Sequence, residues 1–245
     1  MSQQPLQAKA VADENSARRP VRSFVRRAGR LTDGQKRALE QLWPRYGVES
    51  GDAAVDPAGL FGDDRPVILE IGFGDGAATW RMAQANPELN LLGVEVHRPG
   101  IGRLLLALER EGLDNVRVAC GDAVEFLRDF VLPHALDGVC IFFPDPWPKK
   151  RHHKRRLIQP DFLDLLAARM NPGAVLHLAT DWQPYAEHMR EVLDASDRFE
   201  DLAGTQMGDS QAARRPRTKY ERRGERLGHR VIDLVYRRTP ASGKE

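Results

Sequence analysis

The chain has little cysteine, few aromatic residues and no long apolar run. Its 245 residues include two cysteines, Cys120 and Cys140, and 7% aromatic residues. Two cysteines are too few for a disulfide scaffold or a Cys-rich zinc site, and we expect both to be reduced thiols in the core. No apolar stretch is long enough to cross a bilayer, and residues 1–15 lack the apolar core of a secretion signal. These absences favour a cytoplasmic protein that binds no metal and does not span a membrane.

What the chain does have is a balanced composition with strongly segregated charge. Hydrophobic residues make up 41% and charged residues 29%, which fits one α/β domain with tails. The net charge of +2 conceals two basic segments. Residues 1–30 hold seven Lys/Arg and two acids, and residues 214–238 hold ten Lys/Arg and three acids. Such clusters are typical of surfaces that meet phosphates, although for residues 1–30 a merely solvated tail is an equal alternative.

Apolar runs and helical patterns alternate from residue 66 onward. This alternation predicts an α/β fold, with a mostly parallel seven-stranded sheet and helices on both faces. A capped helix over residues 32–43, with Thr32 as its cap, and a loop over residues 47–64 precede it. The predicted strands cover residues 66–71, 90–96, 116–120, 138–143, 174–180, 199–203 and 230–236, and the helices cover 77–86, 101–111, 123–130, 160–170 and 184–196.

Acidic residues stand at or near the ends of three successive predicted strands. Glu70 precedes a glycine turn with the spacing Gly72-x-Gly74-x-Gly76. Diphosphate cofactors favour G-x-G-x-x-G without nearby negative charge, whereas a sulfonium cofactor with an amino group, such as S-adenosyl-L-methionine, tolerates acids there. Glu95, nineteen residues after Gly76, can accept hydrogen bonds from both ribose hydroxyls. Asp122 could accept one from the adenine amino group. The set favours S-adenosyl-L-methionine over an unliganded turn.

The fourth strand runs into a proline-rich turn and then into a basic block. Phe143-Pro144-Asp145-Pro146-Trp147-Pro148 presents one carboxylate in a stiffened backbone. The next eight residues, Lys149–Arg156, contain six Lys/Arg and two histidines. A rigid carboxylate beside dense positive charge predicts chemistry on a polyanion such as RNA. The alternative is a rigid turn with an exposed acid, and Trp147 as a packing residue. The histidine pair has no partner cluster, so a metal site is not expected.

These motifs resemble the bacterial tRNA (guanine-N7)-methyltransferases. The resemblance rests on Glu70-x-Gly72-x-Gly74-x-Gly76, on Phe143–Lys150 with His152, on Thr180-Asp181 and on Thr218–Glu221. It covers about residues 21–238, and the proline–tryptophan–lysine motif is its most specific part. It implies a Rossmann-like class I S-adenosylmethionine-dependent methyltransferase domain over residues 65–239. Before and after that domain lie a flexible basic arm (1–30), a short helix and loop (31–64) and a tail (240–245).

The resemblance also implies which residues form the site. Asp145 would be the catalytic residue, and the substrate would be a guanosine in the variable loop of tRNA, at position 46. The cofactor would be held by Glu70, Gly72, Gly74, Glu95, Asp122 and Asp145. The guanosine would be bound by Lys149, Asp181, Thr218, Lys219, Tyr220 and Glu221. The RNA would be contacted by Arg151, His152, His153, Lys154, Arg155 and Arg156.

Three other functions are open at this point. A methyltransferase for a small molecule or protein would not need the basic block. A non-catalytic RNA-binding module would not need the strand-end acids. An NAD-dependent dehydrogenase would need a different glycine spacing and a hydride-transfer partner. We expect a monomer, because no segment resembles a dedicated dimer helix.

Overall fold

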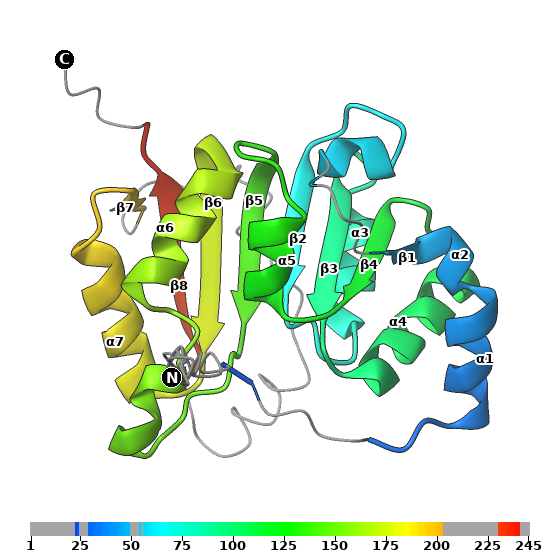
Figure 1. The fold of residues 1–245 in the computed structure, drawn as a ribbon, viewed down its shortest axis with the longest axis horizontal. Helices are drawn as coiled ribbons and strands as arrows, with labels where there is room; N and C mark the ends of the chain where they lie inside the picture. Colours follow the sequence, from blue (N-terminus) through cyan, green and yellow to red (C-terminus); the bar gives the residue numbers. More distant parts are fainter. Residues whose placement is uncertain (1–22, 25–28, 50–53, 55, 203–229, 241–245) are drawn as a thin grey trace, which may run out of the picture.

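The computed structural model describes residues 23–24, 29–49, 54, 56–202 and 230–240 (Figure 1). Most of the predicted basic arm lies outside these residues. The predicted substrate segment Thr218–Glu221 lies outside them entirely. In the described part of the chain, no helix is both long and apolar enough to cross a bilayer.

One eight-stranded sheet forms the centre of the fold. Its strand order is β1-β4-β3-β2-β5-β6-β8-β7. Neighbouring strands are parallel, except that β8 runs antiparallel to both β6 and β7. The strands are β1 (Gly47–Val48), β2 (Val67–Ile71), β3 (Asn90–Glu95), β4 (Val116–Cys120), β5 (Leu136–Phe142), β6 (Met170–Thr180), β7 (Phe199–Asp201) and β8 (Ile232–Arg238).

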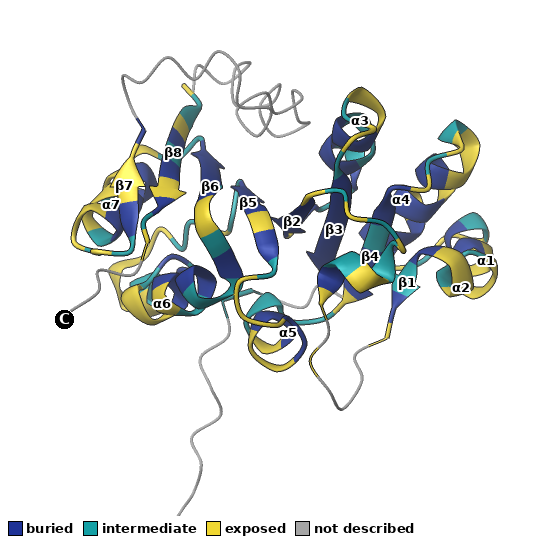
Figure 2. Ribbon diagram, turned by 90° about the horizontal axis from the view of Figure 1, so that it is seen from above, coloured by how far each residue is buried: buried dark blue, intermediate teal, exposed yellow. Residues whose placement is uncertain are grey.

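Helices cover both faces of this sheet. α3 and α4 lie on one face with α1 packed on α4, and α5, α6 and α7 lie on the other (Figure 2). The helices are α1 (Asp33–Gln41), α2 (Trp43–Tyr46), α3 (Ala77–Ala85), α4 (Arg98–Glu111), α5 (Ala123–Asp129), α6 (Pro160–Arg169) and α7 (Gln183–Asp194), with short 3-10 helices η1 (Pro57–Leu60) and η2 (Lys150–Arg155).

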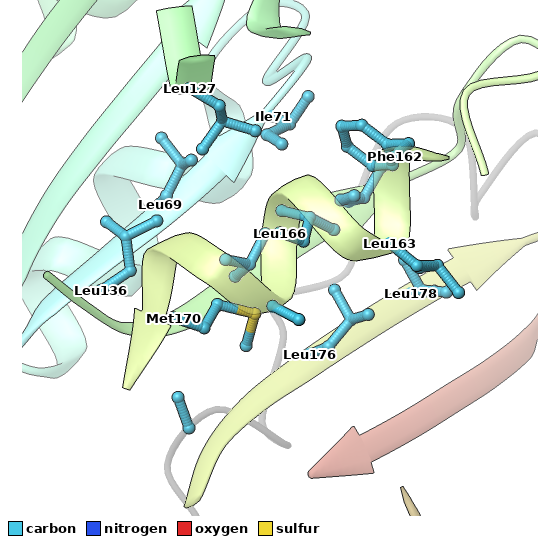
Figure 3. Packing of buried hydrophobic residues seen from close by; sticks show 14 of the residues in the cluster. Leu69, Ile71, Leu127, Leu136, Phe162, Leu163, Leu166, Met170, Leu176 and Leu178 are labelled. Atoms are coloured by element: carbon cyan, nitrogen blue, oxygen red, sulfur yellow. The ribbon is translucent and has the colours of Figure 1, made fainter. Parts of the chain in front are cut away.

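The central strands are buried on both sides, so their side chains alternate between two apolar cores. Leu69 of β2 faces the core under α5 and α6, whereas Ile68 faces the core under α3 and α4. Figure 3 shows the first core, in which Leu166 of α6 packs among leucines of the sheet. Burial on both faces explains why β2 is a continuous apolar run except for Glu70.

Local signals set several helix ends. Thr32 caps α1 with a full capping box, because its hydroxyl accepts from the N–H of Gln35 and the Gln35 side chain accepts from the N–H of Thr32. Gly112 ends α4 in the left-handed conformation, with φ of 64°. The predicted cap of α1 at Thr32 and the predicted end of α4 at Glu111 are therefore confirmed.

The structure corrects three details of the sequence analysis. The sheet has eight strands, because Gly47–Val48, predicted as loop, pairs with Val118 and Ala119 of β4. Met170, predicted to end a helix, begins β6 and pairs with Leu136, and a register shift between Leu136 and Gly138 lets the strand pass through Pro172. Cys140 is buried as expected. Cys120, which was also expected in the core, is exposed at the carboxyl end of β4.

Candidate cofactor and substrate site

Four acidic residues lie at the same edge of the sheet. Glu70 is the last residue but one of β2, and Glu95 ends β3. Asp122 follows β4, and Asp145 follows β5. Because these four strands are parallel neighbours, their carboxyl ends meet at one edge, where open α/β sheets bind ligands. The structure therefore brings the acids that follow the predicted strands to a single edge of the sheet.

The glycine turn between β2 and α3 depends on left-handed backbone. Gly72, Gly74 and Gly76 have φ of 73°, 62° and 73°, a region that side chains disfavour. A Cβ atom added to Gly72 would meet nothing within 4 Å, and this residue is exposed. The turn thus presents bare backbone beside open space, a surface that a ligand can approach closely.

A second glycine lets helix α4 approach this turn. A Cβ atom on Gly100 would lie 1.8 Å from the carbonyl oxygen of Gly74, so no side chain fits between them. Gly100 is in the first turn of α4, directly after β3. The close contact joins the glycine turn to the end of β3.

Glu95 is held by three backbone N–H groups. Its carboxylate accepts from Gly74 at 2.8 Å, from Val96 at 2.7 Å and from His97 at 2.8 Å. The side chain is buried. A carboxylate offers about four acceptor positions, so about one remains for a ligand hydroxyl. The prediction that Glu95 binds both ribose hydroxyls therefore requires it to share or exchange a backbone partner.

Glu70 lies almost fully inside the protein, with 3% of its surface exposed. Its carboxylate accepts a 2.7 Å hydrogen bond from the hydroxyl of Thr79 in α3. The pKa of Glu70 is raised to about 7, chiefly because the carboxylate is buried. The hydrogen bond from Thr79 lowers this pKa, whereas the nearby carboxylates of Glu95 and Asp75 raise it. A cation bound at the turn would be attracted to this carboxylate and would favour its ionised form.

Asp122 has a structural role beside its predicted one. It is the N-cap residue of α5, and its Oδ1 accepts from the N–H of Val124 at 2.8 Å. The cap fixes the side chain just beyond the end of β4, two residues after Cys120, which pairs with Glu95 on the neighbouring strand. The adenine contact stays a prediction.

The turn that carries Asp145 has an unusual backbone. Phe143 and Trp147 have φ of 53° and 44°, which places two bulky residues in the left-handed region. Such residues persist only where the surroundings hold them. The N–H of Phe143 donates to the carbonyl of Ala179 on β6 at 2.7 Å. The indole N–H of Trp147 donates to the carbonyl of Ser23 at 3.0 Å. Asp145, between them, is exposed.

The basic block after this turn forms the short helix η2. Lys149, Lys150, Arg151 and Lys154 are exposed, as a phosphate-binding surface requires. Arg155 lies over the Trp147 ring at 4.9 Å, and His152 meets the edge of that ring at 5.6 Å.

His152 and His153 are partly buried within the same block. Partial burial and then the surrounding cations lower the pKa of His152. A lowered pKa favours the neutral form of the His152 ring. The six lysines and arginines supply the permanent positive charge of the block.

Arg156 differs from the rest of the block because it is only 4% exposed. Its Nε donates to the carbonyl of Pro146 at 3.0 Å, and its guanidinium lies 4.9 Å from the centre of the Tyr185 ring. The group is therefore turned into the protein. The burial of Arg156 does not support the predicted RNA contact for this residue.

The predicted substrate residues are only partly described. Lys149 is the exposed N-cap residue of η2. Asp181 directly follows β6, so it reaches the same sheet edge as Asp145. Thr218, Lys219, Tyr220 and Glu221 lie outside the described residues. Within those residues, no group of three or more His, Cys, Asp or Glu side chains could hold a metal ion.

Comparison with known proteins identifies the family. A protein family described as "Putative methyltransferase" matches residues 64–234. A tRNA (guanine-N(7)-)-methyltransferase of Halorhodospira halophila is 58% identical over 223 residues, which is 91% of this chain and 96% of that protein. One of Nitrosococcus oceani is 54% identical over 90% of this chain and 92% of that protein. The chain belongs to the tRNA (guanine-N7)-methyltransferase family.

A solved structure supports the fold independently of this family. The crystal structure of TrmN from Thermus thermophilus matches with a TM-score of 0.50 at 16% identity, over 83% of this chain and 48% of that one. At this identity the likeness concerns the fold alone. It agrees with the α/β architecture predicted from the sequence of this methyltransferase-family chain.

Sequence reasoning missed three residues that shape the site of this family member. Thr79 and Gly100 were not singled out, and Arg156 was grouped with the exposed cations. A signal existed for Thr79, because it is a polar residue on the sheet-facing side of α3, three positions before the buried Met82. Gly100 and Arg156 gave none, since their roles depend on contacts with Gly74 and Tyr185 from other elements.

Proposed function

We propose that this protein transfers the methyl group of S-adenosyl-L-methionine to N7 of a guanosine in the variable loop of tRNA, at position 46. The observation that carries this proposal is that the predicted cofactor residues and the predicted RNA-binding residues lie at the same edge of the sheet. The glycine turn with its acids and the Asp145 turn with its basic block leave the same edge of the sheet, from neighbouring strands β2 and β5. The names of the relatives support the substrate.

The residues at this edge fit the cofactor. S-adenosyl-L-methionine supplies an electrophilic methyl group on a positively charged sulfur. The bare backbone at Gly72 gives room for its close approach, and the buried carboxylates of Glu70 and Glu95 attract its positive charge. In this proposal the cofactor is held by Glu70, Gly72, Gly74, Glu95, Asp122 and Asp145.

The substrate guanosine binds at the carboxyl ends of β5 and β6, where Asp145 and Asp181 lie. Guanine presents N1–H and 2-amino donors, which a carboxylate can accept and which adenine does not offer in this arrangement. Asp145, Asp181 and Glu221 are the candidates for this recognition. Lys149, Thr218, Lys219 and Tyr220 complete the proposed substrate site. The exposed residues of the basic block would contact the phosphates around it.

The chain is not required to remove a proton, because N7 of guanine already carries a free lone pair. Its residues contribute by aligning N7 for in-line attack. They also stabilise the positive charge that develops on the purine ring. A carboxylate fixed beside the ring does both, and the stiff turn around Asp145 provides such a group. We therefore propose that Asp145 positions and stabilises rather than acts as a base.

The RNA contacts have a further role in this proposal. N7 lies in the major groove and takes part in tertiary contacts of folded RNA, so the variable loop has to be distorted. Unstacking a base costs about a few kcal/mol. Binding of phosphates by Arg151, Lys154 and their neighbours offsets part of that cost. The reaction needs no metal, and in this proposal the protein works as a cytoplasmic monomer.

A matched pair of substrates tests the proposal. Two tRNA transcripts would be prepared that differ only in having guanosine or adenosine at position 46. With S-adenosyl-L-methionine labelled on its methyl group, the first transcript should accept label and the second should not. Equal labelling of both would place the reaction at another nucleotide.

A further inference from the structure

Six of the eight residues from Lys149 to Arg156 are cations, and one of them is unlike the others. Lys149, Lys150, Arg151 and Lys154 are exposed, and Arg155 is partly so. Arg156 is 4% exposed. A buried cation cannot neutralise a phosphate on the surface, and burying it is unfavourable unless its N–H groups find partners. The contacts of Arg156 therefore show what the protein uses it for.

The guanidinium of Arg156 connects three segments. Its Nε donates to the carbonyl of Pro146, in the turn after β5, at 3.0 Å. Its Nη2 lies 3.2 Å from Nε2 of His153, in η2. Its Cζ lies over the ring of Tyr185, in α7, 4.9 Å from the ring centre. Arginine suits this role because a planar group can stack on a ring and donate in its own plane.

The aromatic platform under Arg156 is itself fixed. Tyr185 is fully buried, and its hydroxyl oxygen accepts from the N–H of Ile158 at 3.3 Å. His188, one turn further along α7, lies with Nε2 3.0 Å from the carbonyl of Ile158. Both polar groups of the Ile158 backbone are thus tied to α7. The chain that leaves Arg156 has little freedom to shift.

The held carbonyl belongs to the residue directly after Asp145. The turn from Phe143 to Trp147 forms no helix or strand, and two of its residues have positive φ. Such a turn depends on contacts from outside for a single conformation. We propose that Arg156 is a positioning residue, which fixes the Asp145 carboxylate by holding the Pro146 carbonyl against the Tyr185 platform. This inference rests on the proposed function.

The positioning role and an RNA contact predict different effects of the same variants. Arg156→Lys keeps the charge but loses the planar group over the Tyr185 ring and the Nε donor to the Pro146 carbonyl. If Arg156 positions Asp145, both Arg156→Lys and Arg156→Ala lower kcat by about tenfold to a hundredfold, as small misplacements of a catalytic group do. The Kd for tRNA and its salt slope then stay close to wild type. If Arg156 bound a phosphate, Lys would restore function, and Ala would reduce the salt slope by about one.

Lys154→Ala is the matched control, because it removes an exposed cation two residues away. It should weaken tRNA binding and reduce the salt slope by about one. S-adenosylhomocysteine should raise the melting temperature of every variant, which shows that the fold and the cofactor site are intact. Full kcat in Arg156→Lys would overturn the inference. Absence of tRNA labelling by the wild-type protein would instead overturn the proposed function.

A measurement on the wild-type protein covers the case in which the Arg156 variants fail to fold. Phenylglyoxal modifies accessible arginines, and mass spectrometry locates the modified residues. Arg156 should resist modification both with and without tRNA. Arg151 should react in the free protein and be protected by tRNA. Fast reaction of Arg156 that tRNA suppresses would assign it to the RNA contact and reject the positioning role.

Discussion

The hydroxyl of Thr79 donates a 2.7 Å hydrogen bond to the carboxylate of Glu70, and both side chains are buried between β2 and α3. The contact ties the first helix after the glycine turn to the strand before it. It does not remove the cost of burying the carboxylate, since burial raises the pKa of Glu70 to about 7. Glu70 therefore holds a proton in the folded protein at pH values where it would be ionised in the unfolded chain.

The raised pKa predicts how the stability of the protein depends on pH. Between pH 4.5, the usual pKa, and pH 7 the folded state binds more protons at Glu70 than the unfolded state, so the free energy of unfolding falls as pH rises. Glu70→Gln removes this contribution. From pH 4.5 to pH 7, the free energy of unfolding of the wild type should fall by up to about 3 kcal/mol relative to that of the variant. Urea denaturation of both proteins from pH 4.5 to pH 8 measures the difference, and a difference independent of pH would contradict the assignment.

Gly100→Ala should disturb the cofactor site through the backbone. The new Cβ would lie 1.8 Å from the carbonyl oxygen of Gly74, so α4 and the glycine turn must separate. Overpacking of this kind costs about 1–3 kcal/mol of stability. Binding of S-adenosylhomocysteine should weaken in parallel, which titration calorimetry measures.

Gly59→Ala is the control for that variant, because an added Cβ there meets nothing within 4 Å. It adds the same methyl group to an exposed position in η1. Its affinity for S-adenosylhomocysteine should match that of the wild type. Equal loss of affinity in both glycine variants would mean that the effect does not come from the Gly74 contact.

Much of the fold could be predicted from the sequence because the strands are buried on both faces. Short, mostly apolar runs such as Val116–Cys120, in which Arg117 is the one charged residue, mark these strands, and the structure confirms that range. Strand β1 could not be predicted, since Gly47–Val48 is too short to show a period and is a strand only because β4 lies beside it. Met170 was assigned to the wrong element for the same reason, because pairing with Leu136 decides its conformation.

Asp145→Asn tests the electrostatic role of the proposed catalytic residue. The amide has the same shape but no charge, so positioning is partly kept and stabilisation of the purine cation is lost. We expect kcat to fall by about 10²–10³, as for the loss of one preorganised electrostatic group. The affinity for the cofactor should change only modestly. Turnover close to wild type at saturating tRNA would contradict the proposed role of Asp145.

The exposed basic block should make tRNA binding depend steeply on salt. Arg151→Ala should reduce the slope of log K against log salt by about one, because it removes one phosphate contact. Lys36→Ala is a suitable control, since Lys36 is an exposed cation on α1, away from the Asp145 turn (Figure 1). Fluorescence anisotropy at several salt concentrations measures both slopes. An identical slope in all three proteins would remove Arg151 from the RNA surface.

The candidate site could be predicted in outline but not in its internal contacts. The order of strands brings Glu95, Asp122 and Asp145 to one edge, and a parallel sheet makes this inference possible from sequence alone. The sequence could not show that Glu95 already binds three N–H groups. It also could not separate Arg156 from Arg155, because the groups that hold Arg156, among them the Pro146 carbonyl and the Tyr185 ring, come from other segments of the chain.

The most direct test of the account is to map the methylated nucleotide. Total tRNA lacking the modification would be incubated with the protein and S-adenosyl-L-methionine, and the RNA would then be cleaved chemically at N7-methylguanosine. We expect a single break in the variable loop, at position 46, that forms much more slowly with Asp145→Asn. Methyl incorporation without any break would show that the target atom is not N7 and would contradict the account.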